Sequence, residues 1–183
     1  MEQLEKAVEI FSPIKDKILC ITHGNHENRT YKNEGINLSK FIAVQLGLGD
    51  RYTSTSATLF IRFGDIGGHS HHRKVCYTGY VIHGSGGGRR EGSKVNKLAD
   101  LASIIDVDFY IHSHTHLPLV MKQSFFRIDT ANSAVAPVDK LFVNTAANLK
   151  YGGYGEAAAF KPSSTDTPTI YLCGTRKYME AKL

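Results

Sequence analysis

Long apolar runs are missing from this sequence. No stretch approaches the roughly 18 consecutive apolar residues that a membrane span needs, and the chain opens on the charged segment 1–6 rather than on an apolar one. A secretion signal needs a continuous apolar stretch near the N-terminus. We therefore expect neither a membrane anchor nor a cleaved leader.

Cysteine is scarce as well. The three cysteines, Cys20, Cys76 and Cys173, are odd in number, far apart, and each set in an apolar run. Disulfide-stapled proteins have more and usually paired cysteines. We interpret these three as buried free thiols in a reducing compartment, and we expect a cytoplasmic protein.

Internal repeats and interdomain linkers are also lacking. The 183 residues suit one domain with a sizeable core. Lysine and arginine exceed aspartate and glutamate by 22 to 17, and the sequence pI is about 9.1. This balance favours a polyanionic partner such as a nucleotide or a nucleic acid, and a basic nucleic-acid-binding module is one functional alternative.

Apolar periodicity predicts an α/β fold. Helical spacing indicates a helix over 2–12 that ends near Pro13, a second over 36–48, and a third over 93–105 with Ser93 as N-cap. Runs typical of strands occupy 17–22, 58–63, 75–82, 108–111, 119–128, 140–145 and 169–173. The order strand, helix, strand over 75–111 predicts a βαβ crossover.

Three short polar clusters follow three of these predicted strands. They are Gly24-Asn25-His26-Glu27, His83-Gly84 and His114-Thr115-His116. Because open α/β sheets bind ligands at the carboxyl ends of their strands, we expect the clusters to meet in one crevice. Imidazole nitrogens and amide oxygens are metal ligands. These ligand types do not decide between zinc, manganese, iron and nickel.

The same clusters resemble the last three of the five metal-site motifs of the calcineurin-like metallophosphoesterases, in the family's order. The resemblance implies that Asn25, His83 and His114 hold one divalent ion, and that His116 belongs to a second. It also implies that His26 protonates the leaving oxygen, that the metal is manganese or a related ion, and that the substrate is a phosphoester, such as a nucleotide or nucleic acid.

The first two motifs of that family, Asp-x-His and Gly-Asp-x-x-Asp, are absent before Asn25. They supply most ligands of one ion and the carboxylate that bridges both. We therefore expect a partial calcineurin-like fold without its N-terminal βαβ portion, with one well-held ion and doubtful activity. A non-catalytic metal-binding relic is the other alternative to a phosphodiesterase or phosphomonoesterase.

Two loops carry further polar side chains. Segment 84–90 is too glycine-rich for regular structure, and lacks the Lys-Ser/Thr ending of a nucleotide-binding P-loop. Its Arg89 and Arg90 could clamp a substrate phosphate or simply be exposed. The loop 64–74 contains His69, His71 and His72, which we interpret as a solvated hairpin loop and leave out of the site.

Overall fold

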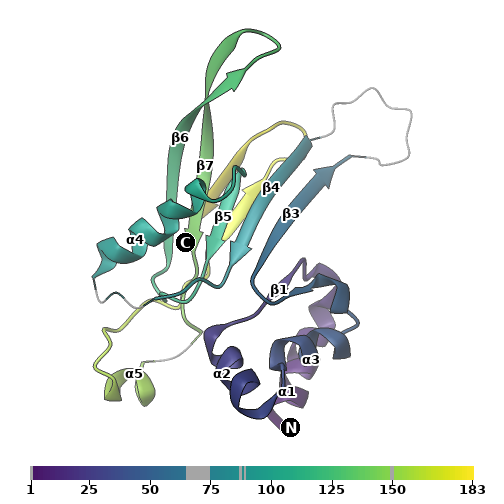
Figure 1. Ribbon diagram of the computed structural model, residues 1–183, viewed down its shortest axis with the longest axis vertical. Coiled ribbons are helices and arrows are strands. Elements are labelled where there is room, and N and C mark those ends of the chain that lie inside the picture. The colour runs from purple at the N-terminus through teal and green to yellow at the C-terminus, as the bar shows by residue number, and fades with distance from the viewer. Residues whose placement is uncertain (1, 65–74, 87, 89, 149–150) are drawn as a thin grey trace.

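A five-stranded mixed sheet forms the centre of the protein in the computed structural model (Figure 1). The structure describes residues 2–64, 75–86, 88, 90–148 and 151–183. The strand order is β3-β4-β5-β7-β6. The central strands β4, β5 and β7 are parallel, and β3 and β6 are antiparallel to their neighbours. These strands span Ser56–Phe63 (β3), Val75–Ile82 (β4), Phe109–His112 (β5), Leu119–Asp129 (β6) and Ala134–Asn144 (β7).

Two small strand pairs lie beside this sheet. β1 (Ile21–Thr22) pairs in parallel with β2 (Tyr52–Thr53), and β8 (Thr169–Leu172) pairs with β9 (Met179–Lys182) in a C-terminal hairpin.

Five α-helices complete the described part of the chain. The first three gather next to β1 at one end of the sheet (Figure 1). The helices are α1 (Glu2–Phe11), α2 (Asn25–Glu34), α3 (Leu38–Gln45), α4 (Glu91–Ala99) and α5 (Tyr154–Ala157), and 3-10 turns span Ser12–Lys17, Gly49–Arg51 and Asp100–Ser103.

Each face of the sheet has its own apolar core. On one face α4 buries Leu98 against Tyr110 and Phe142, whose rings stack with centroids 4.7 Å apart. On the other face the β8–β9 hairpin packs Met179 against Tyr77 and Phe109. The sheet is thus covered on both sides, as the parallel strands at its centre require. Figure 1 shows α4 laid across the sheet.

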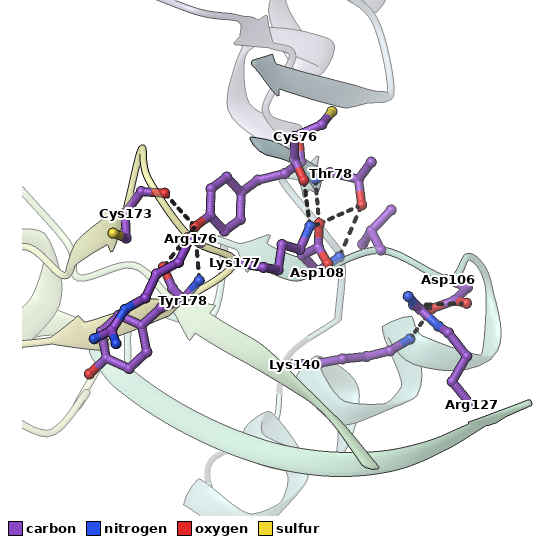
Figure 2. Close-up of polar contacts among 12 residues, drawn as sticks. Cys76, Thr78, Asp106, Asp108, Arg127, Lys140, Cys173, Arg176, Lys177 and Tyr178 are labelled. Carbon is purple, nitrogen blue, oxygen red and sulfur yellow. Dashed lines mark hydrogen bonds and ion pairs between the residues drawn. The ribbon is translucent and has the colours of Figure 1, made fainter. Parts of the chain in front are cut away.

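The C-terminal hairpin is also held by polar contacts. The buried Tyr77 hydroxyl lies 2.7–2.8 Å from the carbonyl oxygens of Cys173, Arg176 and Tyr178 (Figure 2). Nearby, Lys177 Nζ lies 2.6 Å from the buried carboxylate of Asp108. These contacts fix the chain between β8 and β9 to the central strands β4 and β5.

The predicted α/β class and the βαβ crossover are confirmed, because β4 and β5 are parallel neighbours joined through α4. The calcineurin-like fold itself stays a prediction. Two local predictions are wrong. The chain over 12–17 is a 3-10 helix with Pro13 in its first turn, so only residues 21–22 of the predicted strand 17–22 form a strand. Helix α4 begins at Glu91 with Arg90 as N-cap and ends at Ala99, so it covers only part of 93–105.

Candidate metal centre

The three polar clusters meet at one edge of the fold. Asn25 is the first residue of α2, directly after β1 and the N-cap Gly24. His83 follows β4, and His114 lies two residues beyond β5. Because β4 and β5 are parallel neighbours with Ile82 paired to His112, both histidines leave the sheet at the same edge.

Three donor atoms converge there. His83 Nε2 lies 2.9 Å from Asn25 Oδ1, and His114 Nδ1 lies 3.3 Å from each of these two atoms. Ligand atoms on an ion with bonds of about 2.1 Å stand about 3.0 Å apart at a right angle and about 3.4 Å apart in a tetrahedron. The triangle therefore has the dimensions of one face of a metal coordination shell.

The chemistry of these donors fits a cation as well. Asn25 Oδ1 can only accept, so in the absence of a metal a ring nitrogen of His83 or His114 can donate to it. In the other tautomer both ring nitrogens, like the amide oxygen, offer a lone pair to a cation. In the described part of the chain, no three His, Cys, Asp or Glu side chains are grouped so that they could hold a metal ion. A three-ligand site here therefore needs the amide oxygen of Asn25 as its third donor. A divalent ion fits this set, with three ligands from the protein.

The backbone of the His-x-His segment has an uncommon conformation. His114 and His116 have left-handed φ angles of 61° and 56°, which are uncommon for residues with a side chain. Between them Thr115 is buried, and its backbone N–H donates to the Ser113 carbonyl at 2.6 Å. Such strain persists only where the surroundings enforce it, and it often marks functional sites.

His116 stands apart from the donor triangle. Its side chain is exposed, and no hydrogen bond within the described residues joins its ring to Asn25, His83 or His114. The charges that act on its pKa are those of Lys94 and His26. The structure therefore brings together three of the four predicted ligands, and His116 is not among them.

The pKa values of all three imidazoles, His83, His114 and His116, are lowered from their ordinary value. Partial burial, which disfavours the charged form, is the largest cause in each case. The mutual proximity of the rings adds to it at His83 and His114, whereas Glu27 acts in the opposite direction on His83. Neutral imidazoles are the form that binds metals.

His26 is the second residue of α2 and is exposed. Its segment is helical, because α2 begins one residue earlier. Its charge contributes to the lowered pKa of both His114 and His116. No hydrogen bond within the described residues joins its ring to the donor triangle, and its role as a proton donor stays a prediction.

The two predicted phosphate-binding arginines have different outcomes. Arg90 is exposed and forms the N-cap of α4, with its carbonyl accepting from the Ser93 hydroxyl at 2.8 Å. No contact of its guanidinium with the candidate site is found in the described part of the chain. Arg89 lies outside the described residues, as do His69, His71 and His72.

Four residues near the site were not predicted. His112 and Asn144 end β5 and β7, and their buried side chains are joined by a hydrogen bond of 2.8 Å. Lys94 and Lys97 belong to α4 and influence the pKa values of His116 and His114. The apolar run before it could have suggested that His112 is buried, because His112 shares a face of β5 with buried Tyr110.

No family model, no curated protein and no solved structure matches this chain. The assignment to the calcineurin-like family therefore stays a prediction from the three motifs. Among the described residues, no helix is long and apolar enough to cross a bilayer.

Proposed function

We propose that this protein is a metal-dependent phosphoester hydrolase that holds one divalent ion on Asn25, His83 and His114. The observation that carries the proposal is the triangle of 2.9, 3.3 and 3.3 Å between their donor atoms. Those three residues come from three separate segments, and each has the position that the family's motifs assign to a ligand. Manganese is the first metal to test, followed by zinc, iron and nickel.

When bound, a divalent ion supplies Lewis acidity toward a phosphoryl oxygen and lowers the pKa of water toward neutrality. The protein's own residues supply the rest. His26, exposed at the start of α2 and next in sequence to the ligand Asn25, donates a proton to the departing alkoxide oxygen. A general acid of this kind contributes about 10²–10⁴-fold to the rate.

Calorimetric titration with Mn²⁺ tests the ligand set. We expect one tight site in the parent protein and no measurable site in Asn25→Ala or His83→Ala. Asn33→Ala is a matched control on the exposed side of the same helix, and it should bind as the parent does. A parent protein that binds no Mn²⁺, Zn²⁺ or Ni²⁺, or one whose binding survives His83→Ala, would overturn the ligand assignment.

Turnover of phenyl phosphate and of diphenyl phosphate, whose leaving oxygens need a proton at neutral pH, tests the reaction. We expect Mn²⁺-dependent hydrolysis that His26→Gln lowers without changing Mn²⁺ affinity, since His26 lies outside the donor triangle. Metal binding without turnover of either ester would instead identify a non-catalytic metal-binding protein. Binding of DNA that survives His83→Ala and weakens with salt would favour a charge-driven nucleic-acid-binding module.

A further inference from the structure

The outer part of the β6–β7 pair, residues 124–139, forms an arm that projects from the sheet (Figure 1). Strand β5 pairs only with Leu141–Asn144 of β7, so in the described part of the chain the rest of β7 has β6 as its one partner strand. At the base of the arm, Phe125 packs on the core that α4 covers, and Arg127 pairs with Asp106 at 3.3 Å. One face of the arm is therefore attached to the body of the protein.

The opposite face of the arm is apolar and exposed. Phe126 and Ile128 lie on it, and their cross-strand partners are Pro137 and Val135, so the four side chains form one block. Phe126 is 82% exposed, Ile128 73% and Val135 63%. In the described part of the chain, Phe126 is the most exposed of the large apolar side chains. A contiguous apolar patch of this kind marks an interaction surface.

The two edges of the arm are unsuited to an added strand. Pro137 lacks the N–H that a strand added along β7 would require. Along β6, Lys122 and Arg127 are exposed charges of the kind that keep edge strands from pairing. We therefore expect a partner on the apolar face, packed about 10 Å away as one sheet packs on another.

The apolar face is complementary in shape to itself. A second arm can lie over the first in the antiparallel direction, related to it by a two-fold axis. Phe126 of each copy then meets Ile128 of the other. Pro137 meets Val135 in the same way. Each flat or bulky ring thus lies over a smaller branched side chain, and both blocks are covered.

The charges around the face also suit a second copy. The tip of each arm, which carries Asp129, lies over the base of the other, which carries Lys122, so these two charges are opposite in sign. Asp139 of each copy lies below the turn 130–134 of the other, and that turn has no charged residue. No like charges meet in this arrangement.

We propose that the arm is a dimerisation surface, and that its partner is the same face of the arm in a second copy of this chain. Burying the exposed parts of Phe126, Ile128 and Val135 removes on the order of 400 Å² of apolar surface from each copy. The total is below the roughly 1,200 Å² of a stable interface. The dimer is therefore reversible rather than permanent.

Sedimentation equilibrium of the whole protein, up to near-millimolar concentration, tests the dimer. We expect a monomer–dimer equilibrium in the parent protein, and association weakened about 30-fold or more in Phe126→Glu, as the loss of a central aromatic anchor causes. Phe60→Glu is the matched control and should associate as the parent does, because Phe60 is 61% exposed on β3, at the other edge of the sheet. Equal urea midpoints show that both variants are folded.

Hydrogen exchange locates the contact. Exchange over residues 124–139 should slow as the parent dimer forms, and Phe126→Glu should abolish the slowing. A parent protein that stays monomeric at every concentration would overturn the second copy as the occupant of this face. So would a dimer that Phe126→Glu leaves intact, or one that slows exchange elsewhere and not in the arm, because another surface would then hold it.

Discussion

The imidazole of His112 donates through Nδ1 to the side-chain oxygen of Asn144 at 2.8 Å, and both side chains are buried. The direction follows from the other end of the amide, since Asn144 Nδ2 donates to the Leu117 carbonyl at 2.5 Å. This relay joins the ends of β5 and β7 to the segment just after His116. It therefore anchors the left-handed loop that presents His114.

Replacing Asn144 with alanine should loosen that anchor. The change leaves His112 Nδ1 and the Leu117 carbonyl without their partner in a buried place, which costs about 1–3 kcal/mol in the free energy of unfolding. Loss of a group that orients a ligand typically weakens metal binding about 10–100-fold. Urea unfolding and Mn²⁺ calorimetry measure the two effects. Asn148→Ala, at an exposed position, should change neither, and an Asn144→Ala protein with parental Mn²⁺ affinity would contradict the anchoring role.

Gly84→Ala should be strongly destabilising. Gly84 has a φ of +83°, and a Cβ there would lie 2.0 Å from His112 Nε2, so both the backbone and the buried imidazole oppose a side chain. Because Gly84 follows His83, Mn²⁺ binding should weaken as well. Gly92→Ala is the control, since a Cβ at this position in α4 meets nothing within 4 Å. It should be neutral or stabilise by up to about 1 kcal/mol. Equal urea midpoints for the two variants would show that the close approach to His112 is unimportant.

The meeting of the three polar clusters could be predicted because the ends of buried strands can be recognised in a sequence. Val75–Ile82 alternates apolar and small residues up to His83, and the structure confirms that strand with the same bounds. A parallel neighbour then places its own terminal residues at the same edge. The distances between the donor atoms of Asn25, His83 and His114 could not be predicted, because they depend on the loop conformations after the strands.

Helix α2 was not predicted at all. Its sequence Asn25–Glu34 is polar throughout and buries no residue, so it has no apolar stripe for a periodicity argument to detect. What defines it is local, namely Gly24 in an extended N-cap conformation and Gly35 in the left-handed conformation that ends helices. The helical position of His26 could not be predicted for the same reason.

Tyr77→Phe should weaken the attachment of the C-terminal hairpin to the sheet. The phenol donates its single proton among the carbonyls of Cys173, Arg176 and Tyr178, and accepts from the Tyr178 N–H at 3.0 Å (Figure 2). Removing a fully buried hydroxyl that serves these groups should cost about 1–3 kcal/mol. Urea unfolding gives the loss, and hydrogen exchange should quicken first in β8 and β9. Tyr31→Phe, at an exposed site in α2, should leave stability within about 0.5 kcal/mol. Unchanged exchange in the hairpin would contradict the role of the phenol.

Cys173 should be alkylated more readily than Cys20. Hydrogen bonds from the Thr175 side chain and from backbone N–H groups lower the pKa of Cys173 to about 7, whereas burial raises the pKa of Cys20. The thiolate is the reactive form, so iodoacetamide near neutral pH should label Cys173 well before Cys20, as peptide mass spectrometry would show. Thr175→Val removes the hydroxyl that lies 3.3 Å from the sulfur and should slow Cys173. Faster labelling of Cys20 would contradict the assignment.

The lowered pKa values of His83, His114 and His116 make the metal-free protein sensitive to acid. Each imidazole holds its proton less tightly in the folded state than in the unfolded chain, whose ordinary value is 6.5. Because the unfolded state then binds more protons, the free energy of unfolding rises with pH. Well above pH 6.5 the three imidazoles are neutral in both states and do not change the free energy of unfolding. That free energy falls as the pH drops from about 6.5 through the lowered pKa values of the folded state.

Urea unfolding in EDTA at about pH 7.5, 6.5 and 5.5 measures this loss. His83→Asn combined with His114→Asn should flatten the slope over that interval, because neither replacement titrates there. When saturating Mn²⁺ replaces EDTA, the slope of the unfolding free energy against pH should become steeper in the parent protein and not in the double variant, since protons and metal compete for the same nitrogens. A parent protein whose stability is constant from about pH 7.5 to 5.5 would show that these imidazoles are not held in their neutral form.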